Sequence, residues 1–336
     1  MSALSMSTST TAPTPRSGLR KGILWGLPVF VACAFLPLVV PPHILSIMIS
    51  ALLMAYLAQC WNIAAGYAGQ FSLGHSFFFG IGAYATAILF TKLGISPWIG
   101  MFGGAVLAAV AGALVGLLVF RFRIKGVYFA VVTMGLAEIA KGLADNWDYV
   151  GGPVGVLYTM QNDPANYLFI SREPYYYIAL VAVAAMLIGT RLLEMSKTGQ
   201  YFLALREDED AAEAAGVDTR RYKIVAITLS ALLTALGGTF YAQFHLYITP
   251  ETVFHFEHQL NMMLGTMIGG AGTVLGPVIG ALSFSALAEL LRHLPFEESS
   301  AVASLSRMIY AVLMIALMLY LPGGIISLAK RWRKRR

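Results

Sequence analysis

The sequence predicts an all-α, polytopic integral membrane protein with about 8–10 transmembrane helices and with both termini in the cytoplasm. Three observations support this prediction. Of the 336 residues, 58% are hydrophobic and only 12% are charged, whereas a soluble domain usually carries about 25% charged residues. The apolar residues form runs close to the roughly 20 residues that a helix needs to cross a bilayer. The Lys and Arg residues gather between alternate runs, as they do in membrane proteins.

Ten apolar runs are candidate membrane spans. The pair 258–274 and 275–293 is joined by a Gly-rich stretch without charge, so a single broken helix or a re-entrant segment there would leave eight or nine spans. No small-residue cleavage site follows the first run, which we interpret as a retained helix and not as a signal peptide. The ten runs are 23–41, 43–65, 74–92, 97–120, 126–145, 174–193, 223–249, 258–274, 275–293 and 301–321.

The distribution of positive charge predicts the orientation, because Lys and Arg are enriched in cytoplasmic loops. With a cytoplasmic N-terminus, 18 of the 23 Lys and Arg residues fall on the cytoplasmic side. The opposite orientation would place nearly all of them outside. The cytoplasmic set is Arg16, Arg20, Lys21, Arg121, Arg123, Lys125, Arg191, Lys197, Arg206, Arg220, Arg221, Lys223 and the six basic residues of the tail.

The chain divides into one membrane domain with two tails. Residues 1–22 are rich in Ser, Thr and Pro, which predicts a disordered cytoplasmic N-terminus. Residues 23–325 form the transmembrane domain, and 326–336 form a basic cytoplasmic tail suited to anionic lipid head groups. The tail accounts for much of the net charge of +6, so we expect no binding to nucleic acid. Within the domain, 146–173 is expected to be periplasmic and 194–223 cytoplasmic.

The cytoplasmic segment is predicted to contain a short helix. Residues 200–215 are mostly helix formers, and Gly216 is suited to end a helix. Phe202 and Leu205 give it an apolar face beside an acidic one. Such a helix can seat in a groove of a partner protein; an ordinary solvated loop helix is the other interpretation.

A second feature is a cluster of glycines and polar residues at membrane depth. Asn62, Gly66, Gly69, Gln70 and Ser72 predict a break in the helix. Non-helical backbone survives in a bilayer only where protein buries it or where it lines a wet cavity. A translocation route uses such breaks, while tight helix packing through small residues explains the same pattern. For a second glycine ladder, from Gly265 to Gly280, packing is the favoured interpretation.

Glu138 is the one carboxylate well inside a predicted span. An ionisable group in the membrane is a functional candidate by default. A row of charges with Lys141 and Asp145 on one helix face accounts for it equally well.

The sequence lacks the motifs of several enzyme classes. It contains no phosphate-binding loop, no His-Glu-x-x-His motif and no nucleophile elbow. His255 and His258 beside Glu257 are thin evidence for a metal. We therefore expect no catalytic residue, no metal site and no cofactor on this chain.

The sequence resembles the permease subunits of branched-chain amino acid ABC importers of the LivM type, over roughly residues 40–325. Several dispersed motifs in one order are more specific than any single one. Glu213-Ala214-Ala215 is followed directly by Gly216, whereas the general coupling signature of ABC importers places that glycine four residues later. The matching segments are 61–84, 126–138 (GVYFAVVTMGLAE), 151–156 (GGPVGV), 199–216 (GQYFLALREDEDAAEAAG), 269–281 (GGAGTVLGPVIGA) and 321–324 (LPGG).

The resemblance implies a permease that imports branched-chain amino acids across the cell inner membrane. It implies four partner proteins in the lipid bilayer and beside it: a second homologous permease subunit, two cytoplasmic ATP-binding subunits and a periplasmic substrate-binding protein. ATP is then bound by the partner subunits. Related permeases carry urea or short-chain amides, which is the first alternative. A self-sufficient secondary transporter or channel needs coupled ionisable groups at mid-membrane, where only Glu138 is a candidate.

Three sets of candidate residues follow for such a permease. For coupling to the ATPase we assign Phe202, Leu205, Arg206, Glu207, Asp208, Glu209 and Gly216. For the translocation pathway we assign Asn62, Gly66, Gly69, Gln70, Ser72 and Glu138. For docking of the binding protein, the acidic and Gly-rich outer segment supplies Asp148, Gly151, Gly152 and Asp163.

The predicted orientation can be tested with single cysteines at Ser196 and Asn162. Because 194–223 is expected inside and 146–173 outside, an impermeant thiol reagent added to intact spheroplasts should label position 162 and spare position 196. Labelling of position 196 without position 162 would overturn the orientation.

Overall fold

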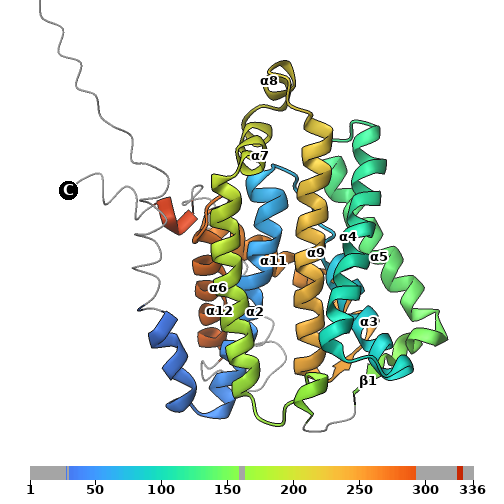
Figure 1. Cartoon of the computed structure of the whole chain (residues 1–336), viewed down its shortest axis with the longest axis vertical. Coiled ribbons are helices and arrows are strands. Elements are labelled where there is room, and N and C mark those ends of the chain that lie inside the picture. The colour runs from blue at the N-terminus through green and yellow to red at the C-terminus, as the bar shows by residue number, and fades with distance from the viewer. Residues whose placement is uncertain (1–27, 29, 159–162, 293–323, 328–336) are drawn as a thin grey trace, which may run out of the picture. The chain divides into compact units, whose positions relative to one another are not determined.

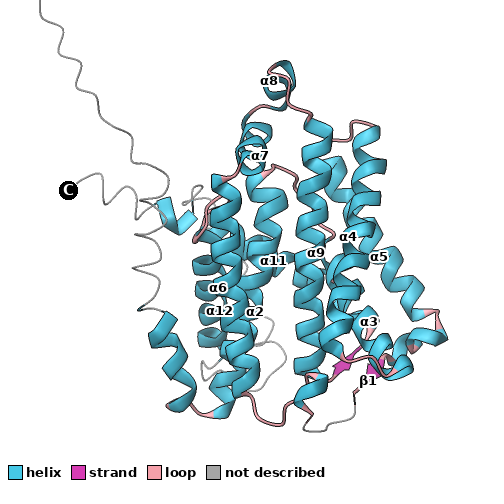
Figure 2. Ribbon diagram, in the orientation of Figure 1, coloured by secondary structure: helices cyan, strands magenta, loops and turns pink. Residues whose placement is uncertain are grey.

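The computed structural model describes residues 28, 30–158, 163–292 and 324–327. Residues 1–40 form a unit of their own, in which Leu36–Leu38 is a short 3₁₀ helix, η1. Residues 41–336 form the second unit, and the rest of the description concerns its described part. Figure 2 shows that helices dominate it and that strands occur at one end alone.

The helices and strands of the second unit follow one another in this order: α2 (Pro42–Trp61), the π-helical turn η2 (Asn62–Tyr67), α3 (His75–Leu93), α4 (Pro97–Arg121), α5 (Val127–Asp145), η3 (Asp148–Val150), η4 (Gly152–Val154), β1 (Val156–Leu157), η5 (Pro164–Asn166), α6 (Glu173–Met195), α7 (Lys197–Glu207), α8 (Glu209–Ala214), α9 (Thr219–His245), β2 (Tyr247–Ile248), α10 (Pro250–Phe254), α11 (Phe256–Gly269) and α12 (Gly276–Arg292).

The predicted fold class is confirmed: the protein is an all-α, multi-pass membrane protein. Six helices in the described part are long and apolar enough to cross a membrane. They coincide with six of the ten predicted spans to within a few residues. The predicted span 23–41 is described only in part, and 301–321 lies outside the described residues. The six are Pro42–Tyr67, His75–Leu93, Pro97–Arg121, Val127–Asp145, Glu173–Met195 and Thr219–His245.

The predicted spans 258–274 and 275–293 are two short helices, α11 of 14 residues and α12 of 17. They pack as an antiparallel pair in which glycines replace side chains at the contact. A Cβ atom on Gly280 would lie 2.0 Å from the Gly265 carbonyl oxygen, so packing explains this part of the glycine ladder. Gly272 lies instead in the turn between the helices, with φ +72°.

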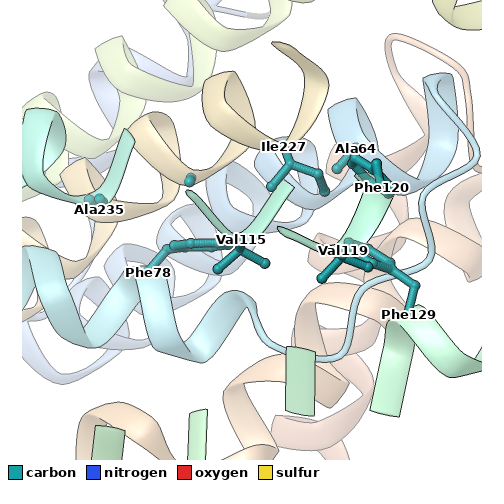
Figure 3. Packing of buried hydrophobic residues seen from close by; sticks show 10 residues of the cluster. Ala64, Phe78, Val115, Val119, Phe120, Phe129, Ile227 and Ala235 are labelled. Atoms are coloured by element: carbon teal, nitrogen blue, oxygen red, sulfur yellow. The ribbon is translucent and has the colours of Figure 1, made fainter. Parts of the chain in front are cut away.

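The core of the second unit lies around α9, which packs against α3 and α4 (Figure 1). Close approach is possible because Gly82 of α3 lacks a side chain: a Cβ atom there would lie 2.0 Å from the Ala235 carbonyl oxygen of α9. The Thr86 and Thr239 hydroxyls then share a buried hydrogen bond of 2.8 Å. Figure 3 shows the buried apolar cluster beside this contact, formed by Ala64, Phe78, Ala108, Val115, Val119, Phe120, Phe129, Ile227, Ala231 and Ala235.

The two long polar segments of the sequence lie at opposite ends of the long helices. Helices α7 and α8 connect α6 to α9 at one end, while β1 lies at the other (Figure 1). At that second end β1 pairs with β2 in antiparallel register, with Val156 opposite Ile248. The end that carries α7 and α8 is called the α7–α8 end below.

Candidate functional site

Two breaks in the helices face each other in the second unit. In the first, α2 continues as the π-helical turn η2, and the backbone is not helical from Ala68 to Gly74. The second break is the turn 270–275 between α11 and α12. Each break contains a glycine in the left-handed region, Gly69 with φ +70° and Gly272 with φ +72°. The sequence predicted the first break and also an interruption between the spans 258–274 and 275–293; the structure shows that the two lie opposite each other.

Asn62 binds the two breaks together. Its side-chain oxygen accepts a hydrogen bond from the Gly272 N–H (2.7 Å), and its side-chain nitrogen donates to the Thr273 carbonyl (3.1 Å). One helical turn earlier, Gln59 donates to the Val274 carbonyl (3.1 Å). Both amide side chains are fully buried. They supply the hydrogen bonds that the second break lacks because it is not helical.

A buried polar network supports the first break in the same way. The Ser72 carbonyl accepts hydrogen bonds from Trp61 Nε1 (2.9 Å) and from Gln259 Nε2 (3.0 Å). Gln259 also accepts from the His75 backbone N–H (2.7 Å). The Ser230 hydroxyl of α9 lies 2.7 Å from His75 Nε2. The path of the chain through the break is therefore held by side chains of α2, α9 and α11.

These contacts change the role expected for the pathway residues. Asn62, Gly66 and Ser72 are buried inside the chain and are not open to a solute in this conformation. Gln70 is half-buried and donates to the Ala68 carbonyl (2.9 Å), while Gly69 is exposed beside α7. The reason is that these polar side chains bond to backbone groups: Asn62 to the second break, and Gln70 and Ser72 within the first. Glu138 lies elsewhere, on the exposed side of α5.

The helix predicted for 200–215 is two helices, α7 and α8, separated at Asp208. The backbone of Asp208 is extended (φ −156°, ψ 110°), and its carboxylate accepts hydrogen bonds from the N–H groups of Asp210 and Ala211 (3.0 Å each). Asp is among the residues preferred at this capping position. The prediction for Gly216 is confirmed, since it follows α8 with φ +86°.

The apolar face of α7 is buried within the chain. Phe202 is fully buried and Leu205 is 5% exposed. The expectation that these two side chains fill a groove of a partner protein is therefore wrong for this conformation, because they pack inside the chain that carries them. Glu207, Asp208 and Glu213 are exposed and available to a partner.

Arg206 of α7 joins the α7–α8 end to both breaks. Its Nη1 atom donates to the Gly66 carbonyl at the first break (2.7 Å) and to the Ala271 carbonyl at the second (3.4 Å). Glycine suits position 272 here, because its φ is +72° and a Cβ atom would lie 2.7 Å from the Gly66 carbonyl oxygen as well as against Arg206 Nη1. One nitrogen of the guanidinium group thus bonds to the breaks, while Arg206 as a residue remains exposed at the α7–α8 end.

Glu209 fixes α8 to the rest of the chain. One carboxylate oxygen pairs with the buried ammonium of Lys223 on α9 (2.5 Å), and the other pairs with Lys125 between α4 and α5 (3.3 Å). The hydrogen bond to Glu209 raises the pKa of Lys125, which keeps this ammonium charged. Glu209 thus forms ion pairs inside the chain, where we had expected a pair with the ATPase. These ion pairs, together with the contacts of Arg206, attach α7 and α8 firmly to the membrane helices.

The opposite end carries the residues expected to dock a binding protein. Asp148 is exposed, and Gly151 and Gly152 turn the chain with φ +94° and +52°. Asp163 is half-buried and accepts a hydrogen bond from Asn166 (2.7 Å). The segment that carries Asp148 also exposes four large apolar side chains. The prediction from the sequence considered only its acidic and glycine residues and missed them; they are Trp147, Tyr149, Val154 and Leu157.

Comparison with known proteins assigns most of the chain to one family. The sequence family described as "Branched-chain amino acid transport system / permease component" matches residues 43–318. The high-affinity branched-chain amino acid transport system permease protein LivM of Escherichia coli is 29% identical, over 84% of this chain and 70% of that protein. LivM of Salmonella typhimurium is 28% identical, over 85% and 71%. The ribose import permease RbsC of Escherichia coli is 27% identical over 60% of this chain and 62% of that protein. No solved structure gives a significant match.

The Asn62→Leu substitution tests the contact between the breaks. Leucine removes both hydrogen bonds and leaves the Gly272 N–H and Thr273 carbonyl without them, at a cost of about 1–3 kcal/mol. We expect a lower melting temperature and faster amide hydrogen exchange in residues 270–275. Asn146→Leu is the matched control, because exposed Asn146 donates only within its own helical turn, to the Gly142 carbonyl. Equal exchange in both variants would contradict the assignment.

Proposed function

Because the chain belongs to the permease-component family of branched-chain amino acid transport systems, we propose that it is the membrane-spanning subunit of an ABC importer for branched-chain amino acids. The observation that supports this substrate is the extent of the match: the LivM proteins of Escherichia coli and Salmonella typhimurium align over more than four fifths of this chain, whereas the ribose permease aligns over 60%. A permease for urea or a short-chain amide is the second candidate, since the fold does not exclude a small polar solute.

The proposed importer contains a second permease subunit, two ATP-binding subunits on the cytoplasmic side and a periplasmic substrate-binding protein. In the inner membrane, the α7–α8 end faces the cytoplasm and the β1–β2 end faces the periplasm. The charge asymmetry supports this orientation, because Lys125, Lys197, Arg220 and Arg221 lie at or beside the α7–α8 end.

Arg206 is the proposed link between ATP hydrolysis and the membrane helices. Hydrolysis takes place on other chains, so its effect must cross a protein contact to reach the pathway. A displacement of α7 reaches both helix breaks at once, because one guanidinium group binds a carbonyl of each. The breaks are the segments of these helices that can rearrange without disrupting a continuous helical ladder.

The exposed acidic side chains supply the proposed contact with the ATP-binding subunits. Three exposed acidic residues of this segment lack an ion pair within the described part of the chain: Glu207, Asp208 and Glu213. Asp210 is exposed as well, but its carboxylate pairs with Lys125 (3.3 Å). Their single sign of charge suits a basic groove on the partner. At the other end, Asp148 and the apolar side chains of Trp147 and Tyr149 form the proposed docking surface for the binding protein.

Uptake in proteoliposomes tests the proposed function. The chain would be reconstituted with the partner subunits and binding protein encoded beside it, and uptake of labelled leucine, isoleucine, valine, urea, acetamide and ribose would be measured with and without ATP. We expect ATP-dependent uptake of the three amino acids. Uptake of urea or acetamide alone would favour the second candidate, and uptake that needs no ATP or partner would reject the importer.

The Arg206→Lys substitution tests the proposed link. Lysine keeps the charge but replaces the rigid, weakly hydrated guanidinium, whose Nη1 reaches both carbonyls, with a flexible and strongly hydrated ammonium. We therefore expect the ATP-binding subunits to copurify and hydrolyse ATP while uptake falls at least about tenfold, the loss of roughly 1.4 kcal/mol of coupling. Arg220→Lys is the matched control, an exposed arginine at the same end. Uptake that stays normal in Arg206→Lys would remove Arg206 from the coupling route.

A further inference from the structure

The outward face of α5 differs from the exposed faces of α4 and α6. Only 28% of the apolar window of α5 is buried, the same share as in α6. Its exposed side chains include the large apolar residues Val131, Ile139 and Leu143, and also the carboxylate of Glu138. Glu138 is the twelfth of 19 residues in α5, which puts it about 16 Å from the first residue of the helix and about 10 Å from the last.

Helices α4 and α6 show what a lipid-facing surface of this protein looks like. Helix α4 exposes Phe102, Val106, Val110 and Leu114, and has no charged residue before Arg121. Helix α6 exposes Val181 and Ile188, and has none between Glu173 and Arg191. A carboxylate directed into lipid is costly, which explains why these faces lack one. By the same argument, the face with Glu138 does not end against lipid.

More charge lies beside Glu138. Lys141, one turn along the same helix, pairs with Glu251 of α10, and both side chains remain partly exposed. Three charged side chains therefore gather on one side of α5 and α10. A soluble partner can reach only the ends of the chain, whereas this face runs along the membrane span. No described residue of this chain covers it, so a further membrane-embedded segment does.

Two glycines on the same side of α5 leave its backbone without side chains beside Glu138. A Cβ atom built on Gly135 or Gly142 would meet no atom within 4 Å, so each glycine leaves an open notch beside Glu138. Notches of this kind let a neighbouring membrane helix approach closely. The charged group and the two notches lie three or four residues apart, so they share one face of the helix.

We propose that the α5 face formed by Val131, Gly135, Glu138, Ile139 and Gly142 is the surface that binds the second permease subunit. Glu138 then borders the polar passage between the two permeases, where water and polar groups of the partner solvate its carboxylate. This inference rests on the proposed function, which supplies the partner. It also gives Glu138 a role beyond its place in the charge row with Lys141.

Photo-crosslinking in the assembled importer tests the proposal. The probe p-benzoylphenylalanine would replace Val131 on α5, and Val106 on α4 and Val181 on α6 would be matched controls; the three side chains are 60%, 60% and 57% exposed. We expect a permease–permease adduct from position 131, and lipid adducts or none from positions 106 and 181. Lipid adducts alone from position 131, or permease adducts from a control position instead, would overturn the proposal.

A pair of glycine substitutions gives a second readout. Gly142 on α5 and Gly189 on α6 are both exposed, and neither has an atom within 4 Å of a built Cβ. Gly142→Leu should fill the notch and reduce copurification of the second permease several-fold, whereas Gly189→Leu should not. Full copurification with Gly142→Leu would count against the proposal. Failure of the α5 interface proposal can be told apart from failure of the proposed function. If only the interface is wrong, the unsubstituted importer still performs ATP-driven uptake. If the proposed function is wrong, it does not.

Discussion

The structure depends on one constraint: a backbone N–H or carbonyl group at membrane depth must find its hydrogen bond inside the protein. A continuous helix meets this requirement automatically. A chain that interrupts its helices at 68–74 and again at 270–275 must meet it with side chains. Asn62, Gln59 and Gln259 do so, each from a buried position and each bonded to a backbone group of a break. Without these amides neither break could persist in lipid.

Each break is stabilised by segments far away in the sequence. Asn62 and Thr273 are 211 residues apart, and Arg206 lies between them along the chain while bonding to both breaks. The glycines complete this arrangement, because Gly272 leaves room for the guanidinium group and Gly280 lets α12 pack on α11. The breaks and α7 thus form one bonded unit, which is the structural basis for treating α7 as a transmitter of motion.

The charged residues divide into groups with different surroundings. Glu209 and Lys223 pair within the chain and fix α8 in place, whereas Glu207 and Glu213 are exposed at the α7–α8 end. Glu138 belongs to neither group, since it is exposed on a helix that lies at membrane depth. We propose that the three environments serve three tasks: attachment within the chain, contact with a soluble partner and contact with a membrane partner.

The sequence by itself determined the fold class, six of the helices, the first helix break and the left-handed stop at Gly216, because each follows from local composition. Apolar runs, glycines and caps act over a few residues. Only the tertiary structure decided what the polar residues do. Phe202 and Leu205 form an apolar face that suits a partner's groove as well as this chain's own core, and Asn62 suits a wet pathway as well as a buried turn. The choice depends on which distant segment lies opposite each side chain, here the membrane helices for α7 and the turn at 270–275 for Asn62. Short-range patterns cannot contain that information, because Asn62 bonds to a residue 210 positions away and Arg206 of α7 to one 140 positions away.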